Sequence, residues 1–469
     1  MTIFTHMHKK GNNMKRRKDI TPTIFREYDL RGIYPTDIDS DVAYTIGKSF
    51  GSYIQTMGET TTIVGHDNRE SGEELYQAFL EGLKETGVHV LSLGLVTTPM
   101  YYYAKKKEKL KTGVMITASH NPREYNGFKV SFSEVGNAYG DAIREFQKFT
   151  EACEFKEGNG DITPYSIHDD YLALIKNSIK LGRHRMKVVV DCGNGTGSII
   201  VKEVMQQFPI KVEYLYCESD PTFPNHHPDP AVSKNMIDLG KKVVELGYDL
   251  GIGIDGDADR VGFVDNKGKV VPIDQFMLLV YRDLNNHLKN RKALFDVKCG
   301  KSLIDGLEDL GIEPVMYRTG ASYTNMMVNT GDFDFGGEFS GHVFFRDKFP
   351  GFDDGIYAGL RMIEILSKKR KSFTKLLKDV PQYVSTEEIK IATTEEKKFD
   401  IVEKVKDYAI DEGYAFEDID GVRVEWWDAW ALVRASNTGP NITLRFEAKD
   451  QATLEDVQKE FMDFIQTLL

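Results

Sequence analysis

The chain has 469 residues, of which 41% are hydrophobic and 28% charged, an ordinary balance for a globular protein of about three domains. Its net charge of −12 at pH 7 argues against a nucleic-acid binder, because such a protein needs a basic surface to displace counterions from phosphate. No apolar stretch approaches the roughly 18–20 residues of a membrane span. The four scattered cysteines show neither metal-type spacing nor a disulfide framework, which favours a reducing cytoplasm.

The predicted elements begin after a polar leader. Residues 1–20 are basic and lack an apolar stripe, which predicts a disordered segment. From Phe25 onward, short apolar runs that end in Gly, Asp or Ser alternate with helix-length amphipathic segments. This alternation is typical of an α/β fold with mixed, mostly parallel sheets, whose ligands gather at the carboxyl ends of the strands.

Three segments of the chain are weakly alike. Residues 112–122, 249–260 and 333–342 each place glycine near an apolar run and then a polar cluster. Three related α/β units would each contribute one polar loop to a shared cleft, although many α/β strands end in this way and the likeness can be coincidental. The residues from 381 onward combine two amphipathic helices with strands of antiparallel type, which predicts a smaller α+β domain.

The sequence DGDADR is the clearest candidate metal site. Its three carboxylates, Asp255, Asp257 and Asp259, alternate along the chain, so in an extended loop they can converge on one hard cation. Three carboxylates beside Arg260 suit Mg²⁺ shared with a phosphate. The alternative is a solvated acidic turn, which the apolar strand directly before the run disfavours.

The sequence TASHNP supplies a candidate nucleophile. Ser119 follows a predicted strand, with His120, Asn121 and Lys129 close by. In isolation such a serine is more often a turn hydroxyl. Near a divalent cation and several positive side chains it could carry a phosphoryl group, because phosphoryl transfer depends on charge neutralisation and positioning.

Two further loops have the composition of a phosphate site and a sugar site. In RASNTGP, Arg434 can grip phosphate bidentately, and the polar residues that follow it, Ser436, Asn437 and Thr438, offer hydroxyl and amide donors. A plain turn between two strands is the alternative. In GEFSGH, Glu338 and Ser340 are two apart in an extended loop and suit sugar hydroxyls, with His342 two residues further on.

Other positions are ambiguous by themselves. FREYDLRG holds Tyr28 and Arg31, which also fit an ordinary strand with exposed charge. Lys298 stands at another predicted strand end, and Arg69 in GHDNRESG more often would cap a helix than contact a substrate.

Taken together, the motifs are recognisable. From Phe25 to the C-terminus the chain resembles the α-D-phosphohexomutase superfamily, with TASHNP, DGDADR, GEFSGH and RASNTGP in the family's order. The last two look closest to the phosphomannomutase/phosphoglucomutase branch. The resemblance implies four domains around a central cleft, the first three related α/β units and the last α+β. We expect them at residues 21–163, 164–264, 265–380 and 381–469.

The resemblance also implies a role for each motif residue. Ser119 would be the phosphoserine, which holds Mg²⁺ through its phosphoryl oxygen together with Asp255, Asp257 and Asp259. Arg260 would lie against the phosphoserine and His120 would line the cleft, both as catalytic residues. Lys129 and His342 would be the general acid/base candidates. The remaining cleft residues would be Glu338, Ser340, Tyr28 and Arg31 for the sugar, and Arg434, Ser436, Asn437, Thr438 and Lys298 for the distal phosphate.

The reaction implied is the interconversion of hexose 1-phosphate and hexose 6-phosphate, with mannose and/or glucose as the sugar. A hexose 1,6-bisphosphate intermediate would turn round in the cleft, and glucose or mannose 1,6-bisphosphate would activate the enzyme, which we expect to be a cytoplasmic monomer. Ala321, Phe339 and His66 depart from residues common among relatives and leave the choice of sugar open. The alternatives are a mutase for another sugar such as glucosamine phosphate, a bisphosphate-forming relative, a phosphatase, or a non-catalytic sugar-phosphate-binding relative.

Overall fold

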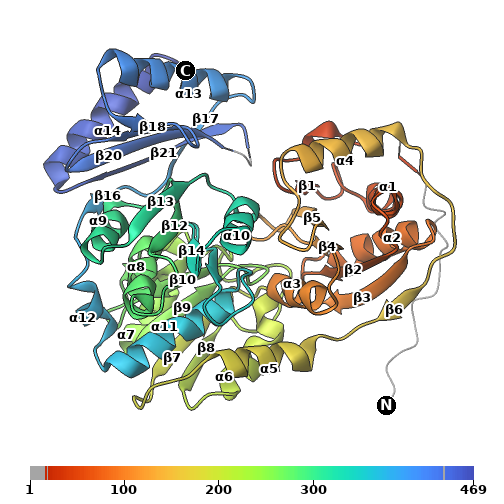
Figure 1. The fold of residues 1–469 in the computed structure, drawn as a ribbon, viewed down its shortest axis with the longest axis horizontal. Helices are drawn as coiled ribbons and strands as arrows, with labels where there is room; N and C mark the ends of the chain where they lie inside the picture. The colour runs from red at the N-terminus through yellow and green to blue at the C-terminus, as the bar shows by residue number, and fades with distance from the viewer. Residues whose placement is uncertain (1–15, 18, 437–438) are drawn as a thin grey trace.

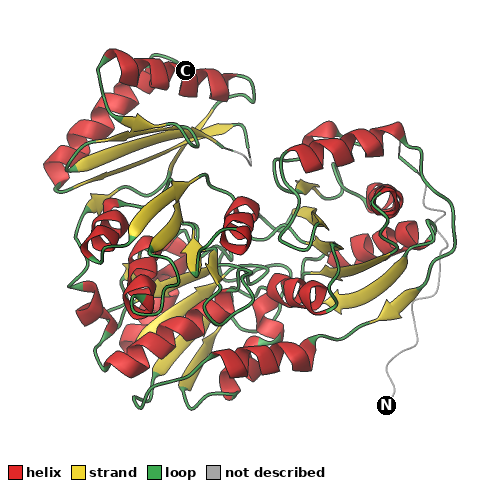
Figure 2. Ribbon diagram, viewed as in Figure 1, coloured by secondary structure: helices red, strands yellow, loops and turns green. Residues whose placement is uncertain are grey.

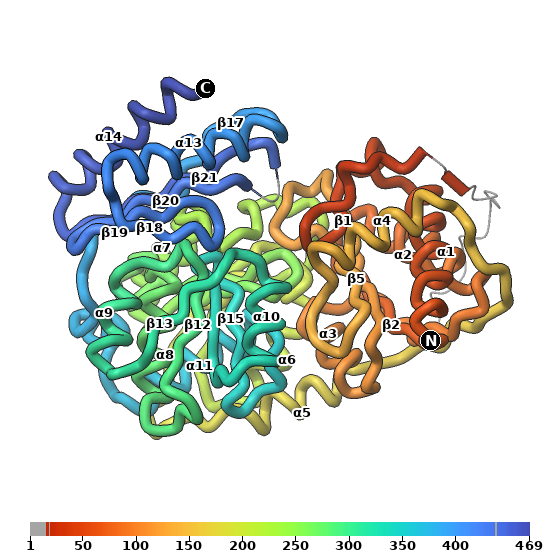
Figure 3. Tube along the Cα trace, turned by 45° about the horizontal axis from the view of Figure 1, so that its top comes forward, coloured from red at the N-terminus to blue at the C-terminus, as the bar shows by residue number. Residues whose placement is uncertain are grey.

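The computed structural model describes residues 16–17, 19–436 and 439–469, so most of the predicted leader lies outside the described residues. Four β-sheets follow one another along the chain, each with helices packed on it (Figure 2). We call each sheet with its helices a unit. The first unit, red to yellow in Figure 1, lies beside the second and third units, and the blue fourth unit lies above the third. The tube in Figure 3 shows the same arrangement from another angle.

The first unit contains a six-stranded sheet in which β2 pairs in parallel with β3 and β4, while β5 pairs antiparallel with β4 and β1. In spatial order its strands are β1 (Leu30–Ile33), β5 (Tyr125–Phe132), β4 (Thr112–Ile116), β2 (Thr61–His66), β3 (His89–Leu95) and β6 (Ile162–Pro164). Its helices are η1 (Pro22–Ile24), α1 (Ser40–Thr56), α2 (Gly72–Lys84), α3 (Thr98–Lys107) and α4 (Asp141–Ala152). The Asp39 side chain caps α1 by accepting from the backbone N of Val42.

The second and third units each have a parallel centre with antiparallel strands at one side. The second sheet runs β11 (Val270–Val271), β10 (Val261–Val264), β9 (Leu250–Ile254), β7 (Lys187–Asp191), β8 (Lys211–Leu215). The third runs β13 (Glu313–Tyr317), β12 (Lys292–Asp296), β14 (Phe335–Gly337), β15 (Val343–Phe345). Their helices are α5 (His168–Ser178), η2 (Thr196–Ile199), α6 (Val201–Gln206), η3 (Ser233–Met236), α7 (Ile237–Leu246), α8 (Ile273–Leu284), α9 (Lys301–Asp309), α10 (Ala321–Thr330), α11 (Gly355–Lys369) and α12 (Phe373–Leu377).

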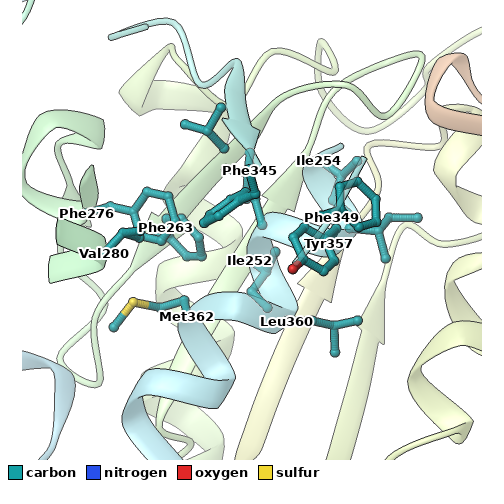
Figure 4. Close-up of a cluster of buried hydrophobic side chains, with 14 of the residues drawn as sticks. Ile252, Ile254, Phe263, Phe276, Val280, Phe345, Phe349, Tyr357, Leu360 and Met362 are labelled. Carbon is teal, nitrogen blue, oxygen red and sulfur yellow. The ribbon is translucent and has the colours of Figure 1, made fainter. Parts of the chain in front are cut away.

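Helix α11 joins the second and third units in one hydrophobic core. It follows the third sheet in the chain yet packs on β9 and β10 of the second sheet as well as on α8. Figure 4 shows Tyr357, Leu360 and Met362 of α11 among side chains of both sheets, including Ile252 of β9 and Phe345 of β15. Because the two sheets share this core, the loops that leave them are fixed relative to each other.

The fourth unit is an antiparallel sheet covered by two helices, α13 (Lys397–Asp411) and α14 (Gln451–Gln466). Its strands are β16 (Val384–Ser385), β21 (Asn441–Ala448), β20 (Ala429–Ala435), β19 (Val422–Glu425) and β18 (Phe416–Glu417), with β17 (Ile389–Ala392) also paired to β21. Trp430 and Leu432 of β20 pack on Val297 of the third unit. The predicted fold class, three α/β units followed by an α+β unit, is confirmed. Within the described part of the chain, no helix is long and apolar enough to cross a membrane.

Candidate active site

Ser119 lies in the loop after β4, facing the second unit. Its backbone φ is 50°, in the left-handed region, and its side chain is buried with 3% exposed. The Ser119 Oγ donates to Asp255 Oδ2 at 2.9 Å. Gly256 makes this approach possible, because a Cβ there would lie 2.4 Å from the Ser119 carbonyl oxygen. The serine hydroxyl is thus held directly against the acidic loop.

The three aspartates of DGDADR converge in the loop between β9 and β10, and all are buried. One carboxylate oxygen of each lies within 4.8 Å of the others. Burial and the neighbouring carboxylates raise the pKa of Asp255 well above its usual value. Burial together with the charge of Asp257 raises the pKa of Asp259 to about 6. Three acidic groups packed this closely repel one another unless positive charge lies between them.

Lys129 on β5 supplies part of that positive charge. Its Nζ lies 2.7 Å from Asp257 Oδ2 and 2.6 Å from Asp259 Oδ2. Burial opposes the charged form, yet the two carboxylates hold the pKa of Lys129 well above its usual value. Burial also favours a neutral Asp257, but Lys129 outweighs it and lowers the pKa of that carboxyl.

The acidic loop keeps unused oxygen atoms that fit a cation. Asp257 Oδ1 and Asp259 Oδ1 are buried and have no hydrogen-bond partner among the described residues. A buried carboxylate oxygen without a partner carries a desolvation cost of about 1–3 kcal/mol. Hard divalent cations take oxygen ligands of this kind. The donor set therefore fits a divalent metal ion such as Mg²⁺, and the residues form an acidic cluster that could bind one.

Two threonines that the sequence analysis missed complete the surroundings of Asp257. The Thr98 Oγ1 at the start of α3 donates to Asp257 Oδ2 at 2.7 Å, and the Thr117 Oγ1 donates to the same atom at 3.2 Å. Thr117 Oγ1 also accepts from the backbone N of Ser119 at 2.8 Å. These contacts hold Asp257 Oδ2 against the first unit. The other carboxylate oxygen, Oδ1, takes part in none of them.

Arg69 has a structural role that the expectation of a helix cap did not include. Its guanidinium is buried and donates to four backbone carbonyl oxygens, those of Ser119, Asn121, Pro122 and Tyr125. Its Nε also lies 3.3 Å from a carboxylate oxygen of Asp67. Arg69 therefore fixes the whole loop that carries Ser119.

A chain of three side chains runs from Asp353 to Arg260. The Arg260 Nε donates to His342 Nε2 at 2.7 Å, so the proton of a neutral His342 ring is on Nδ1, which lies 2.7 Å from Asp353 Oδ2. Burial and the charge of Arg260 hold the pKa of His342 well below its usual value. Both ring nitrogens are engaged, so His342 orients Arg260 in this arrangement. Asp353 has no motif around it that would have marked it in the sequence.

Glu338 and Ser340 lie in the loop between β14 and β15. The Glu338 carboxylate accepts from the backbone N of Gly320 and from Thr324 Oγ1, both at 2.9 Å, and from Ser340 Oγ at 3.1 Å. Burial and the nearby charge of Asp296 raise the pKa of Glu338 to about 7. The two residues form one hydrogen-bonded group, as their spacing suggested.

The expected phosphate-binding residues are spread over the third and fourth units. Lys298, after β12, is 7% exposed, and Arg434 on β20 is 6% exposed. Ser436 is also buried, and its backbone N donates to Asn441 O at 2.9 Å. Asn437 and Thr438 lie outside the described residues.

The first unit contributes Tyr28, Arg31 and His120, which are each buried or half-buried. His120 Nδ1 lies 3.2 Å from Ser119 Oγ, and burial together with the charge of Arg260 lowers the pKa of this histidine well below its usual value. Arg31 donates to Asn121 Oδ1 at 2.7 Å. The pKa of Tyr28 is raised by burial and by Asp29, while the charge of Arg434 from the fourth unit acts in the opposite direction.

The comparisons with known proteins agree with this geometry. Family models described as phosphoglucomutase/phosphomannomutase α/β/α domains I, II and III match residues 22–157, 169–268 and 272–383, and the model of the C-terminal domain matches 388–464. The chain belongs to the phosphoglucomutase/phosphomannomutase family. The resemblance predicted from the four motifs is thereby confirmed.

Similar proteins cover nearly the whole chain. A phosphomannomutase/phosphoglucomutase of Pseudomonas syringae pv. tomato is 42% identical over 441 residues, which are 94% of each chain. A phosphoglucomutase of Neisseria meningitidis serogroup A is 38% identical over 453 residues, 96% of this chain and 98% of that one. A crystal structure of a family protein from Burkholderia thailandensis superposes with a TM-score of 0.88 at 34% identity, covering 96% and 98% of the two chains.

The three positions expected to depart from common family residues have definite surroundings. Phe339 stacks under the guanidinium of Arg445, whose carbon is 3.6 Å from the ring centroid, so it joins the third unit to the fourth. Ala321 begins α10, directly after Gly320. The His66 Nε2 lies 3.1 Å from Glu73 Oε2 on α2. These contacts give Phe339 and His66 packing roles within the family fold.

Proposed function

We propose that this chain is a phosphohexomutase that interconverts hexose 1-phosphate and hexose 6-phosphate, with mannose and/or glucose as the sugar, through phosphoserine 119 and a hexose 1,6-bisphosphate. The enzyme class follows from family membership and from relatives over nearly the whole chain that are named phosphomannomutase/phosphoglucomutase or phosphoglucomutase. The observation that carries the site assignment is the 2.9 Å contact between Ser119 Oγ and Asp255, whose loop supplies two buried carboxylate oxygens without a hydrogen-bond partner among the described residues.

Asp255, Asp257 and Asp259 are the residues that would hold Mg²⁺. When bound, the cation supplies positive charge that stabilises the phosphoryl group during transfer. Lys129 already neutralises part of the acidic loop, and Arg260 is fixed by His342 beside it. The chain therefore surrounds the Ser119 hydroxyl with oriented charge before any substrate arrives, which is the arrangement that lowers the reorganisation needed during reaction.

In the proposed reaction the bond between phosphorus and Ser119 Oγ breaks while a bond forms between phosphorus and the free hydroxyl oxygen of the sugar. The sugar hydroxyl loses one proton, and Ser119 Oγ gains one as it returns to a hydroxyl. The hydroxyl proton passes to a side chain, for which Lys129 and His342 are the candidates. His342 can accept the proton at Nε2 only after Arg260 releases that atom. Lys129 can accept it only in its neutral form, which requires that its contacts with Asp257 and Asp259 first weaken. His120, 3.2 Å from Ser119 Oγ, is positioned to exchange a hydrogen bond with that oxygen.

We further propose that Glu338, Ser340, Tyr28 and Arg31 bind the sugar. Arg434, Ser436, Asn437, Thr438 and Lys298 would bind the distal phosphate. A glucose or mannose 1,6-bisphosphate would act as activator by phosphorylating Ser119. The proposed enzyme is a cytoplasmic monomer whose four domains span residues 21–163, 164–264, 265–380 and 381–469.

A coupled mutase assay with Mg²⁺ and a trace of glucose 1,6-bisphosphate tests the proposal. Wild type and Ser119→Ala are compared with mannose 1-phosphate and with glucose 1-phosphate. Turnover of both sugars that is lost in the variant is the expected result. No turnover of either sugar by phosphorylated wild type would contradict the proposed substrates and would point to another sugar, while release of inorganic phosphate without isomerisation would point to a phosphatase.

A further inference from the structure

Both cations proposed for the distal phosphate are already paired with carboxylates of the fourth unit. Lys298 Nζ lies 2.9 Å from Glu388 Oε1. Arg434 donates through Nε and Nη2 to Asp420 Oδ2, at 3.1 and 2.9 Å. Neither carboxylate belongs to a motif that the sequence analysis singled out. The positive charge of the phosphate site is therefore balanced before a phosphate binds.

These two carboxylates also connect separate units. Glu388 directly precedes β17 of the fourth unit, whereas Lys298 follows β12 of the third. Asp420 Oδ2 accepts at 3.0 Å from the backbone N of Thr319, which follows β13. The contacts therefore hold the fourth unit against the third at the point where the phosphate is expected.

A buried cation needs a partner at every stage of a reaction. Removing one member of a buried ion pair costs about 3–5 kcal/mol, because the remaining charge is left without a partner or water. Lys298 and Arg434 are both buried, so they would face this cost each time a phosphate left them. The charge of Lys298 lowers the pKa of Glu388 to about 2, so this carboxylate stays ionised and available.

We propose that Glu388 and Asp420 are exchangeable counter-ions of the phosphate site, which pair with Lys298 and Arg434 when it is empty and release them to an incoming phosphate. This inference rests on the proposed function, in which the bisphosphate must leave the distal site once in each turnover in order to turn round. Glu388 and Asp420 are positioning residues. They weaken phosphate binding enough for release and hold the fourth unit in place during the turn.

Neutral variants of the same shape separate this role from a merely structural one. Glu388→Gln and Asp420→Asn remove a negative charge that competes with the phosphate. Each is therefore expected to bind phosphate about tenfold more tightly, the equivalent of one hydrogen bond to a charged group. At the same time kcat should fall, because release of the intermediate becomes slower. A variant that merely loosens the fold would bind more weakly.

Calorimetric titration of the full-length chain tests the inference, with Ser119→Ala as the background so that nothing turns over. Inorganic phosphate and glucose 1-phosphate are titrated into that chain, into its Glu388→Gln and Asp420→Asn derivatives, and into a Glu387→Gln control at the exposed neighbouring position. Tighter binding of inorganic phosphate by the two derivatives but not by the control is expected.

The two probes distinguish the possible failures. Unchanged or weaker binding of inorganic phosphate by both derivatives would overturn the counter-ion role, whatever the sugar phosphate does. Tighter binding of inorganic phosphate together with no binding of glucose 1-phosphate, and none of mannose 1-phosphate titrated in the same way, would uphold the counter-ion role and contradict the proposed function. Kinetics of the same variants with Ser119 intact then check that KM and kcat fall together.

Discussion

Arg69→Lys tests whether a single guanidinium holds Ser119 in the position proposed for phosphoryl transfer. The two terminal nitrogens of Arg69 donate at 2.6–2.9 Å to the carbonyl oxygens of Ser119, Asn121, Pro122 and Tyr125. The compact ammonium of lysine can retain about two of these four bonds. At roughly 1.5–3 kcal/mol for each bond from a charged donor, the loop loses about 3–6 kcal/mol of support. The left-handed backbone conformation of Ser119 costs roughly 1–2 kcal/mol, which is less than the hydrogen-bond energy that the loop loses. We therefore expect the loop to relax in the variant.

The expected result in a mutase assay is a fall in kcat of about a hundredfold, because a displacement of about 1 Å at a reacting atom has an effect of that size. The KM for hexose phosphate should change little, since the expected phosphate ligands lie in other units. Arg123→Lys is the matched control, because Arg123 belongs to the same loop but is exposed. Near-wild-type kcat and unchanged phosphorylation of Ser119 in Arg69→Lys, measured by intact-protein mass spectrometry, would refute the reasoning.

Asp257→Asn removes a negative charge from the acidic loop and is expected to lower kcat by about a hundredfold or more. The circular dichroism spectrum should stay unchanged, and near-normal turnover at limiting Mg²⁺ would contradict the metal assignment. Asp353→Asn replaces the carboxyl group that lies 2.7 Å from His342 Nδ1 and so loosens Arg260, which should lower kcat about tenfold while KM stays constant. An unchanged kcat would show that Arg260 needs no such support. Because the pKa of Glu338 is raised to about 7, the stability that its protonated form contributes is lost as the pH rises from about 4.5 to 7. Urea unfolding at pH 5 and at pH 8 gives the free energy of unfolding of wild type and of Glu338→Gln. From pH 5 to pH 8 the free energy of unfolding of Glu338→Gln should rise by up to about 3 kcal/mol relative to that of wild type. A difference that does not change with pH would contradict the raised pKa.

Much of the site could be predicted because its residues follow strands. Ser119 comes three residues after β4, the aspartates follow β9 and Lys298 follows β12, and each of these strands has at least one parallel neighbour in its sheet. A carboxylate or hydroxyl at the carboxyl end of such a strand is visible in the sequence as polar residues after an apolar run. The fold class followed from the same alternation of strands and helices, together with the change of pattern near residue 381.

The residues that could not be predicted act through partners far away in the chain. Thr98 donates to Asp257, which lies 159 residues further along the chain. Arg423 of β19 donates to the backbone oxygen of Val297, which lies 126 residues earlier. The sequence favoured a helix cap for Arg69 because the carbonyl oxygens that it binds belong to the backbone, which is the same for every residue type. Backbone acceptors of this kind exist only once the loop has folded.

The charges of the site give the strongest physical reason to regard it as a place where ligands bind. Asp257 and Asp259 keep buried carboxylate oxygens that accept no hydrogen bond from a described residue, although buried polar groups in proteins almost always have a hydrogen-bond partner. On the opposite side of the proposed site, Lys298 and Arg434 are paired with carboxylates that belong to another unit or to a flanking loop. A fold selected for stability alone would place apolar side chains at such positions, because these are often at least as stable as a buried ion pair. Unsatisfied oxygens at one end and exchangeable ion pairs at the other are what a protein needs if a cation and a phosphate must both enter, and if the phosphate must leave again in every turnover.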